Sequence, residues 1–200
     1  MGCRCNYVGI ASAIRQIAAD WLQRASRQSR ATSRPHASHD RSPSRLATGR
    51  RLSDNRPMEA PRYLHLKPGV APPRLEGVAP FKAVVVVDSE VTPEWQAEVS
   101  DWLVRSGCRW MMAWGRKCGD WDTSVDLANL AMFDYGEIPD DDFVVTTWHE
   151  NESLQETFWF SERCAMHSSL KLETYVVHIA LQSRATELLK AFRAAQEETD

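Results

Sequence analysis

The sequence has no run of about 18 to 20 consecutive apolar residues, the length that a helix needs to cross a bilayer, so we expect no membrane partner. No continuous apolar core of about 7 to 15 residues follows the first basic residue, which argues against a secretory signal. Collagen-like and heptad patterns are also missing. The remaining interpretation of 200 residues with 43% hydrophobic content is one globular domain plus some excess chain.

Several nucleotide and metal motifs are missing as well. The chain has no G-x-x-x-x-G-K-[ST], no G-x-G-x-x-G after its first predicted strand, no H-E-x-x-H and no paired C-x-x-C, which disfavours P-loop NTPases, dinucleotide oxidoreductases and common zinc sites. Five cysteines are present, and Cys3 and Cys5 lie at the N-terminus. The odd number that remains argues against a disulfide framework and for a reducing compartment, so we predict a cytoplasmic protein.

Lysine is absent from residues 1–57, which carry eleven Arg and three Asp for a net charge of +8. This Ser-rich leader has too few large apolar residues to offset about 1 to 2 kcal/mol of backbone entropy per residue, so it is predicted to be disordered. It resembles a targeting leader or a basic arm for nucleic acid or anionic lipid; alternatively, Met58 is the working start. Residues 58–200 have 13 basic and 24 acidic groups, which argues against a nucleic-acid surface there.

The domain is expected over residues 81–200, after a Pro-rich extended lead-in at 58–80. FKAVVVV is apolar on both faces, as in the central strand of a covered sheet. A helix follows, with Thr92 as N-cap, Pro93 in its first turn and Gly107 as its stop. Its apolar stripe comprises Trp95, Val99, Trp102 and Leu103. The run from 108 to 114 predicts a second, parallel strand, since it follows a strand and a helix.

The same alternation continues to the end of the chain. Thr123 and Asp126 resemble a capping box for a helix over about 124–133, and Ser153 with Glu156 forms another before the next helix. FVVTTW and TYVVHIA predict the third and fourth strands, and an apolar stripe from 185 to 195 predicts a closing helix. The expected fold is therefore α/β, a small three-layer sandwich of four mainly parallel strands with helices on both faces.

Such a sheet binds ligands outside the carboxyl ends of its strands. This rule selects Cys118, His149 and Asp122 as a candidate nucleophile, base and orienting acid. Further candidates at the same rim are Asp88, Glu90, Trp114, Trp121 and Glu150. The acids, together with Asp120, could bind Mg²⁺, or they could be helix caps and solvated loop residues. Metal and cofactor therefore stay unknown.

Each of these residues also has a structural interpretation. Cys118 fits a small, partly buried residue in a tight loop, and His149 fits a helix cap or a loop ligand. His178, between two apolar strand residues, fits a core histidine with satisfied hydrogen bonds. Trp114 could finish a buried strand, and Trp121 could either stack on a ligand or fill the core.

The chain contains two sequence motifs, W-G-x-x-C-x-x-W-D-x-S-V-D-x-A-N and T-T-W-H. Through these motifs the chain resembles, over about residues 80–181, a family of short bacterial proteins described as a domain of unknown function. The resemblance implies a bacterial cytoplasmic protein and carries over no catalytic residue. Two functions remain open. One is a hydrolase-like enzyme with its site at the carboxyl ends of the strands, and the other is a non-catalytic ligand-sensing or protein-interaction module. The small-molecule or protein partner stays unknown.

Overall fold

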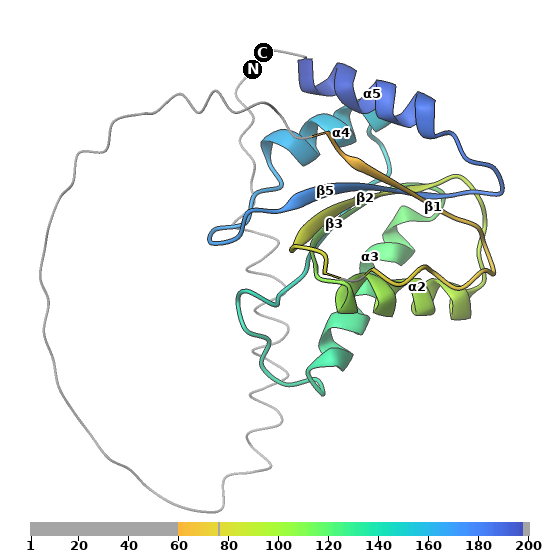
Figure 1. Cartoon of the computed structure of the whole chain (residues 1–200). Coiled ribbons are helices and arrows are strands. Elements are labelled where there is room, and N and C mark those ends of the chain that lie inside the picture. Colours follow the sequence, from red (N-terminus) through yellow and green to blue (C-terminus); the bar gives the residue numbers. More distant parts are fainter. Residues whose placement is uncertain (1–59, 76, 198–200) are drawn as a thin grey trace, which may run out of the picture. The chain divides into compact units, whose positions relative to one another are not determined.

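The computed structural model describes residues 60–75 and 77–197, so the expectations for residues 1–57 lie outside the described part of the chain. All five strands are parallel and lie in the order β1-β5-β2-β3-β4 (Figure 1). The strands are β1 (Arg62–Leu66), β2 (Phe81–Val87), β3 (Cys108–Gly115), β4 (Val145–His149) and β5 (Glu173–Ile179). The helices are α2 (Pro93–Arg105), α3 (Cys118–Met132), α4 (Leu154–Arg163) and α5 (Ala185–Glu197).

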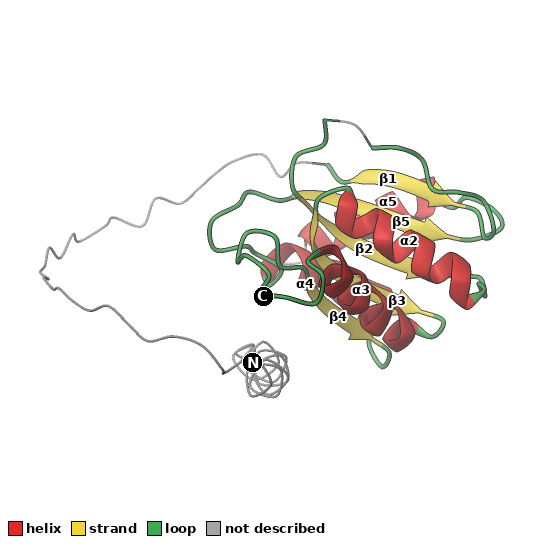
Figure 2. Cartoon of the chain, turned by 90° about the horizontal axis from the view of Figure 1, so that it is seen from below, coloured by secondary structure: helices red, strands yellow, loops and turns green. Residues whose placement is uncertain are grey.

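Helices cover both faces of the sheet, with α2 and α3 on one side and α4 and α5 on the other (Figures 1 and 2). The predicted three-layer α/β fold is confirmed. The sheet has one more strand than predicted, because the stretch expected as an extended lead-in contains β1. This strand pairs with β5 at the edge of the sheet, with Leu64 opposite Val177.

Strand β2 occupies the centre of the sheet, between β3 and β5. All seven of its residues are buried, which explains why its sequence is apolar on both faces. Lys82 is the polar exception. Its ammonium group donates to the carbonyl of Ser161 and lies 3.3 Å from a Glu162 carboxylate oxygen, so the buried charge has partners.

Two helix starts follow the sequence signals closely. The Thr92 side chain accepts a hydrogen bond from the Trp95 amide at the start of α2. At the start of α4, Ser153 and Glu156 form the expected reciprocal capping box. On α2, Trp102 is only partly buried, because its indole N–H reaches out to the Pro73 carbonyl at 2.7 Å in the segment before β2.

Helix α3 begins at Cys118, six residues before the predicted start. The chain turns directly from β3 into the helix through Gly115, at φ +100°, and Lys117, at φ +49°. A Cβ on Gly115 would lie 2.4 Å from the Val87 carbonyl oxygen on the neighbouring strand, so only glycine fits this position. Thr123 is consequently inside the helix, and Asp126 accepts a hydrogen bond from Thr146 instead of capping.

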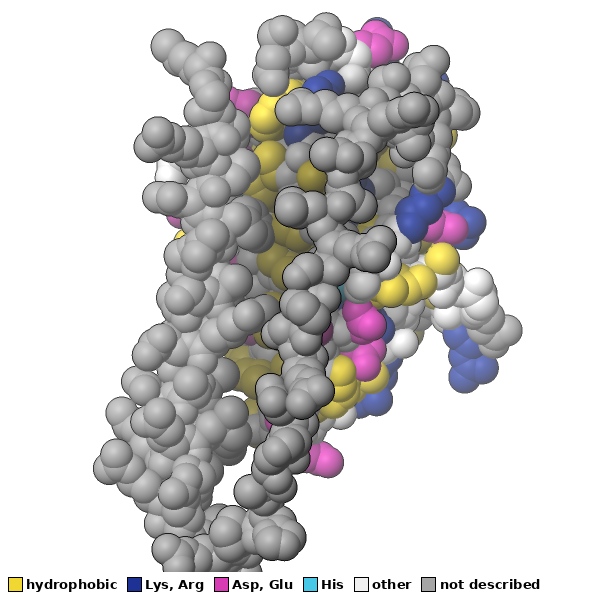
Figure 3. Space-filling view, turned by 90° about the vertical axis from the view of Figure 1, so that its left-hand side faces the viewer, with side chains coloured by type: hydrophobic (Ala, Val, Ile, Leu, Met, Phe, Trp, Pro, Cys, Tyr) yellow, Lys and Arg dark blue, Asp and Glu magenta, His cyan; other side chains and the backbone are white. Residues whose placement is uncertain are grey.

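The face of the molecule in Figure 3 shows acidic, basic and hydrophobic side chains interspersed among the described residues. Charges of both signs therefore lie near one another on this face. Among residues 60–75 and 77–197, no helix is long and apolar enough to cross a membrane.

Candidate functional site

The strand order reverses between β2 and β5. From β2 the chain proceeds outward to β3 and β4, and it then crosses back to place β5 on the other side of β2. In open parallel sheets this switch point leaves a crevice at the carboxyl ends of the two strands, where ligands commonly bind. Asp88 follows β2 at this point, and His178 lies one residue before the end of β5. The register sets His178 between Val86 of β2 and His65 of β1.

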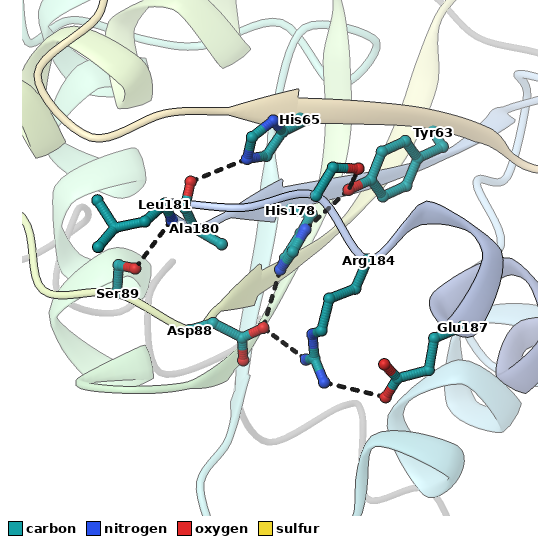
Figure 4. Close-up of polar contacts among 10 residues, drawn as sticks. Tyr63, His65, Asp88, Ser89, His178, Ala180, Leu181, Arg184 and Glu187 are labelled. Carbon is teal, nitrogen blue, oxygen red and sulfur yellow. Dashed lines mark hydrogen bonds and ion pairs between the residues drawn. The ribbon is translucent and has the colours of Figure 1, made fainter.

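Four side chains form a continuous hydrogen-bonded chain at the switch point, which we call the β5 relay: Ser183, Tyr63, His178 and Asp88. Figure 4 shows how Tyr63, His178 and Asp88 lie in this chain. The hydroxyl groups of Ser183 and Tyr63 are 2.8 Å apart, and the Tyr63 oxygen lies 2.8 Å from Nδ1 of His178. On the other side of the ring, Nε2 lies 2.8 Å from Oδ2 of Asp88. Three elements distant in the sequence therefore supply one polar network.

The ring of His178 is fully buried. Burial lowers its pKa, and the nearby Asp88 opposes this effect by hydrogen bonding and by charge. In the neutral ring, Nε2–H donates to the Asp88 carboxylate, which leaves Nδ1 as the acceptor for the Tyr63 hydroxyl. The Tyr63 oxygen then accepts from Ser183. Both hydroxyl groups therefore donate in the same direction, from the exposed Ser183 to Tyr63 and from Tyr63 to the buried ring of His178.

Asp88 is held by Arg184 as well as by His178. A second nitrogen of the Arg184 guanidinium donates to Glu187 of α5 at 3.0 Å, which ties the first turn of α5 to the end of β2. Beside the relay, His65 Nε2 lies 2.8 Å from the Ala180 carbonyl oxygen (Figure 4). These bonds fix the ends of β1, β2 and β5 relative to one another.

Of the residues predicted for the rim, Asp88 alone enters this relay. Glu90 is exposed and lies 3.6 Å from Arg116. The indole N–H of Trp114 donates to the Glu152 carbonyl at 2.8 Å. Trp121 is buried and makes an edge contact with Trp95, so it fills the core between α2 and α3. Glu150 is exposed just after β4.

His149 and Cys118 lie close in the fold, but the His149 ring makes its hydrogen bonds elsewhere. Its Nδ1 lies 2.6 Å from a Glu152 carboxylate oxygen, its Nε2 lies 3.1 Å from the Thr147 hydroxyl, and the ring packs edge-on against Phe160. Cys118 is buried in the first turn of α3, and this burial raises the pKa of its thiol.

Asp122 lies one turn after Cys118, in a different environment from His149. Oδ1 of Asp122 is buried and has no hydrogen-bond partner. Burial raises the pKa of this carboxyl group, while the nearby Thr146 hydroxyl opposes the effect. Asp126, one further turn along α3, accepts from the Thr146 hydroxyl at 2.7 Å, and burial raises its pKa to about 6. Within the described residues, no group of three or more His, Cys, Asp or Glu side chains is arranged to hold a metal ion.

Sequence reasoning did not select Tyr63, Ser183 or Arg184. Tyr63 lies in β1, where the sequence predicts an extended lead-in, and Ser183 lies in a short loop with no distinctive spacing. His178 was visible as a polar residue in an apolar strand, but its partners depend on the order of the strands.

The fold and the relay define a class of protein, an all-parallel α/β sandwich with a polar network at its topological switch point. The chain belongs to the family described as a domain of unknown function (DUF7684), whose model matches residues 61–195. Neither a curated protein nor a solved structure matches the chain.

Proposed function

We propose that the protein is a hydrolase-like enzyme that acts on an ester or amide carbonyl at the carboxyl ends of β1, β2 and β5. The observation that carries this proposal is the continuous chain of hydrogen bonds from the exposed hydroxyl of Ser183 through Tyr63 to His178 and Asp88. A serine with a hydrogen-bonded base, itself oriented by a third group, is the arrangement that nucleophilic catalysis requires.

In the proposed reaction, Ser183 Oγ attacks the carbonyl carbon while its proton moves to the Tyr63 oxygen. The Tyr63 proton moves at the same time to Nδ1 of His178, and Asp88 stabilises the resulting imidazolium. When the tetrahedral intermediate collapses, the leaving group takes a proton back from Tyr63, which His178 replenishes. Water then attacks the acyl-serine by the same proton path, which releases the acid and restores the hydroxyl.

Two neighbouring features support this chemistry. Helix α5 begins two residues after Ser183, and the first backbone N–H groups of a helix have no intrahelical acceptor, so they are available for a developing oxyanion. Arg184 and Glu187 hold the Asp88 carboxylate in place from α5. Arg184 is therefore a positioning residue in the proposed mechanism.

The test uses the full chain with para-nitrophenyl acetate as the substrate and diisopropyl fluorophosphate as a serine trap. The trap should label Ser183, forming an O–P bond and releasing fluoride, and S183A should lose both labelling and turnover. Y63F keeps the aromatic ring but removes the proton path, so turnover should fall about 100-fold or more. The control is S168A, which alters an exposed serine in the loop between α4 and β5. Turnover in S183A, or labelling at another serine, would overturn the proposal.

The catalytic roles predicted for Cys118, His149 and Asp122 stay predictions, and the same assay tests them. C118S, H149Q and D122N should keep turnover if the β5 relay is the site. Loss of turnover in these variants, with S183A active, would move the site to the ends of β3 and β4.

The second candidate function is the non-catalytic interaction module. One observation favours it: Trp148 on the edge strand β4 has half of its surface exposed. A large aromatic side chain in this position is typical of a binding anchor.

A further inference from the structure

We propose that the open edge of β4 binds an extended segment of a partner protein that carries arginine or lysine. This proposal rests on the second candidate function, the interaction module, and specifies its partner. The proposal does not depend on the β5 relay. We call this surface the β4 edge; it comprises β4 together with Asp122 and Asp126 of α3.

The first support is the position of β4 in the sheet. β4 is the last strand of the sheet and pairs only with β3 among the described strands, so the backbone groups on its other side lie at the edge of the sheet. Natural edge strands are commonly protected by proline, by lysine or by a bulge. The sequence VTTWH has no proline or lysine, and its register with β3 is regular. On the opposite edge, by contrast, Pro61 directly precedes β1 and Arg62 is its first residue.

The second support is an anchor on this edge. Trp148 is 50% exposed, and its ring lies 3.9 Å from where a Cβ on Gly119 would be, in the first turn of α3. The indole therefore lies near the first turn of α3. A sixth strand added beside β4 would cover the exposed part of this ring, and burial of tryptophan contributes strongly to interfaces.

The third support is charge, which selects the partner. Gly119 and Asp122 are one helical turn apart, and Asp126 is the next turn along, so both carboxyl groups follow the Trp148 ring along the same side of α3. Asp126 bonds to Thr146, which lies two residues before Trp148 and therefore on the same face of the strand. Asp122 has a buried oxygen without a hydrogen-bond partner. A guanidinium or ammonium group from the added strand would pair with these carboxyl groups.

Binding is tested on the full chain with two fluorescent peptides, one of alternating Thr and Arg and one of alternating Thr and Glu. Fluorescence anisotropy should detect binding of the Arg peptide, and the tryptophan emission of the chain should change with it. The double variant D122N/D126N should weaken this binding about tenfold or more, since it removes the charges but keeps the shapes. W148K should abolish it by placing a charge on the edge.

The control is L127S, because Leu127 is exposed on α3 but points away from the carboxyl side of the helix, and this variant should bind as the parent does. Equal binding of the two peptides, unchanged binding in W148K, or no binding of either peptide would each overturn the proposal. A second copy as the occupant would appear as self-association that W148K removes, and this outcome would also overturn it. None of these results depends on para-nitrophenyl acetate turnover, so the two proposals fail separately.

Discussion

At the scale of the residue, burial changes the acid–base behaviour of Asp126. The pKa of this carboxyl group is about 6 in the fold because burial penalises its charged form. An unfolded chain gives aspartate a pKa of about 3.9. The group's contribution to stability is therefore fully present below pH about 4 and is lost as the pH rises through about 6.

D126N should remove this dependence and be more stable than the parent at pH 7, by about 2 to 3 kcal/mol. Urea unfolding from pH 4 to 7 measures the effect, and the parent should lose stability over this range relative to D126N. D120N, which alters an exposed residue of the same helix, is the control. A parent that gains stability relative to D126N as the pH rises would contradict the prediction.

The two buried thiols give a second prediction at this scale. Burial raises the pKa of Cys108 to about 12 and also raises the pKa of Cys118. Since the thiolate is the reactive form, iodoacetamide should alkylate both slowly in the native protein and rapidly in urea. Peptide mass spectrometry resolves the sites. Fast alkylation of Cys118 in the native protein would contradict the expected protection and would favour Cys118 as the nucleophile, as the sequence predicts.

At the scale of the element, the close approach of the end of β3 to the end of β2 depends on one glycine. Gly115 and Gly107 have nearly the same backbone angle, at φ +100° and +94°, but a Cβ on Gly115 would meet the Val87 carbonyl, whereas nothing lies within 4 Å at Gly107. G107A should cost about 1 kcal/mol through backbone strain alone. G115A should cost about 3 kcal/mol or more, because strain and overlap add. Thermal or urea unfolding compares the two variants, and equal costs would show that the overlap relaxes freely.

Local sequence signals predicted the elements whose causes are local. The apolar run of β2, the Thr92 cap and the Ser153–Glu156 capping box each act within a few residues, and each has its expected place. The start of α3 was wrong because Gly115 allows an immediate turn, which leaves the Thr123 signal inside the helix. Strand β1 was missed because its partner, β5, lies more than 100 residues away.

The candidate site shows the same division at the scale of the whole molecule. The rule for parallel sheets placed the candidate site at the carboxyl ends of the strands and included Asp88, which is also a member of the β5 relay. It could not select Tyr63 or Ser183, since Tyr63 contacts both His178 and Ser183 only in the folded sheet. The position of β1 beside β5 is a further long-range effect, which no spacing in the sequence expresses.

The strand order also predicts how the whole molecule opens. In β2 every residue is buried, and it is paired on both sides, as are β3 and β5, whereas β1 and β4 pair on one side. Local opening requires less free energy at such edges than in the centre. Native-state hydrogen exchange should therefore be slowest in β2, β3 and β5 and faster in β1 and β4.

Saturating Arg peptide should slow exchange in β4 without changing β1, because an added strand would supply acceptors to the β4 edge alone. Without peptide, β4 could exchange as slowly as β2. This result would show that the outer amides of β4 are already protected, and it would contradict the prediction that strands paired on one side exchange faster.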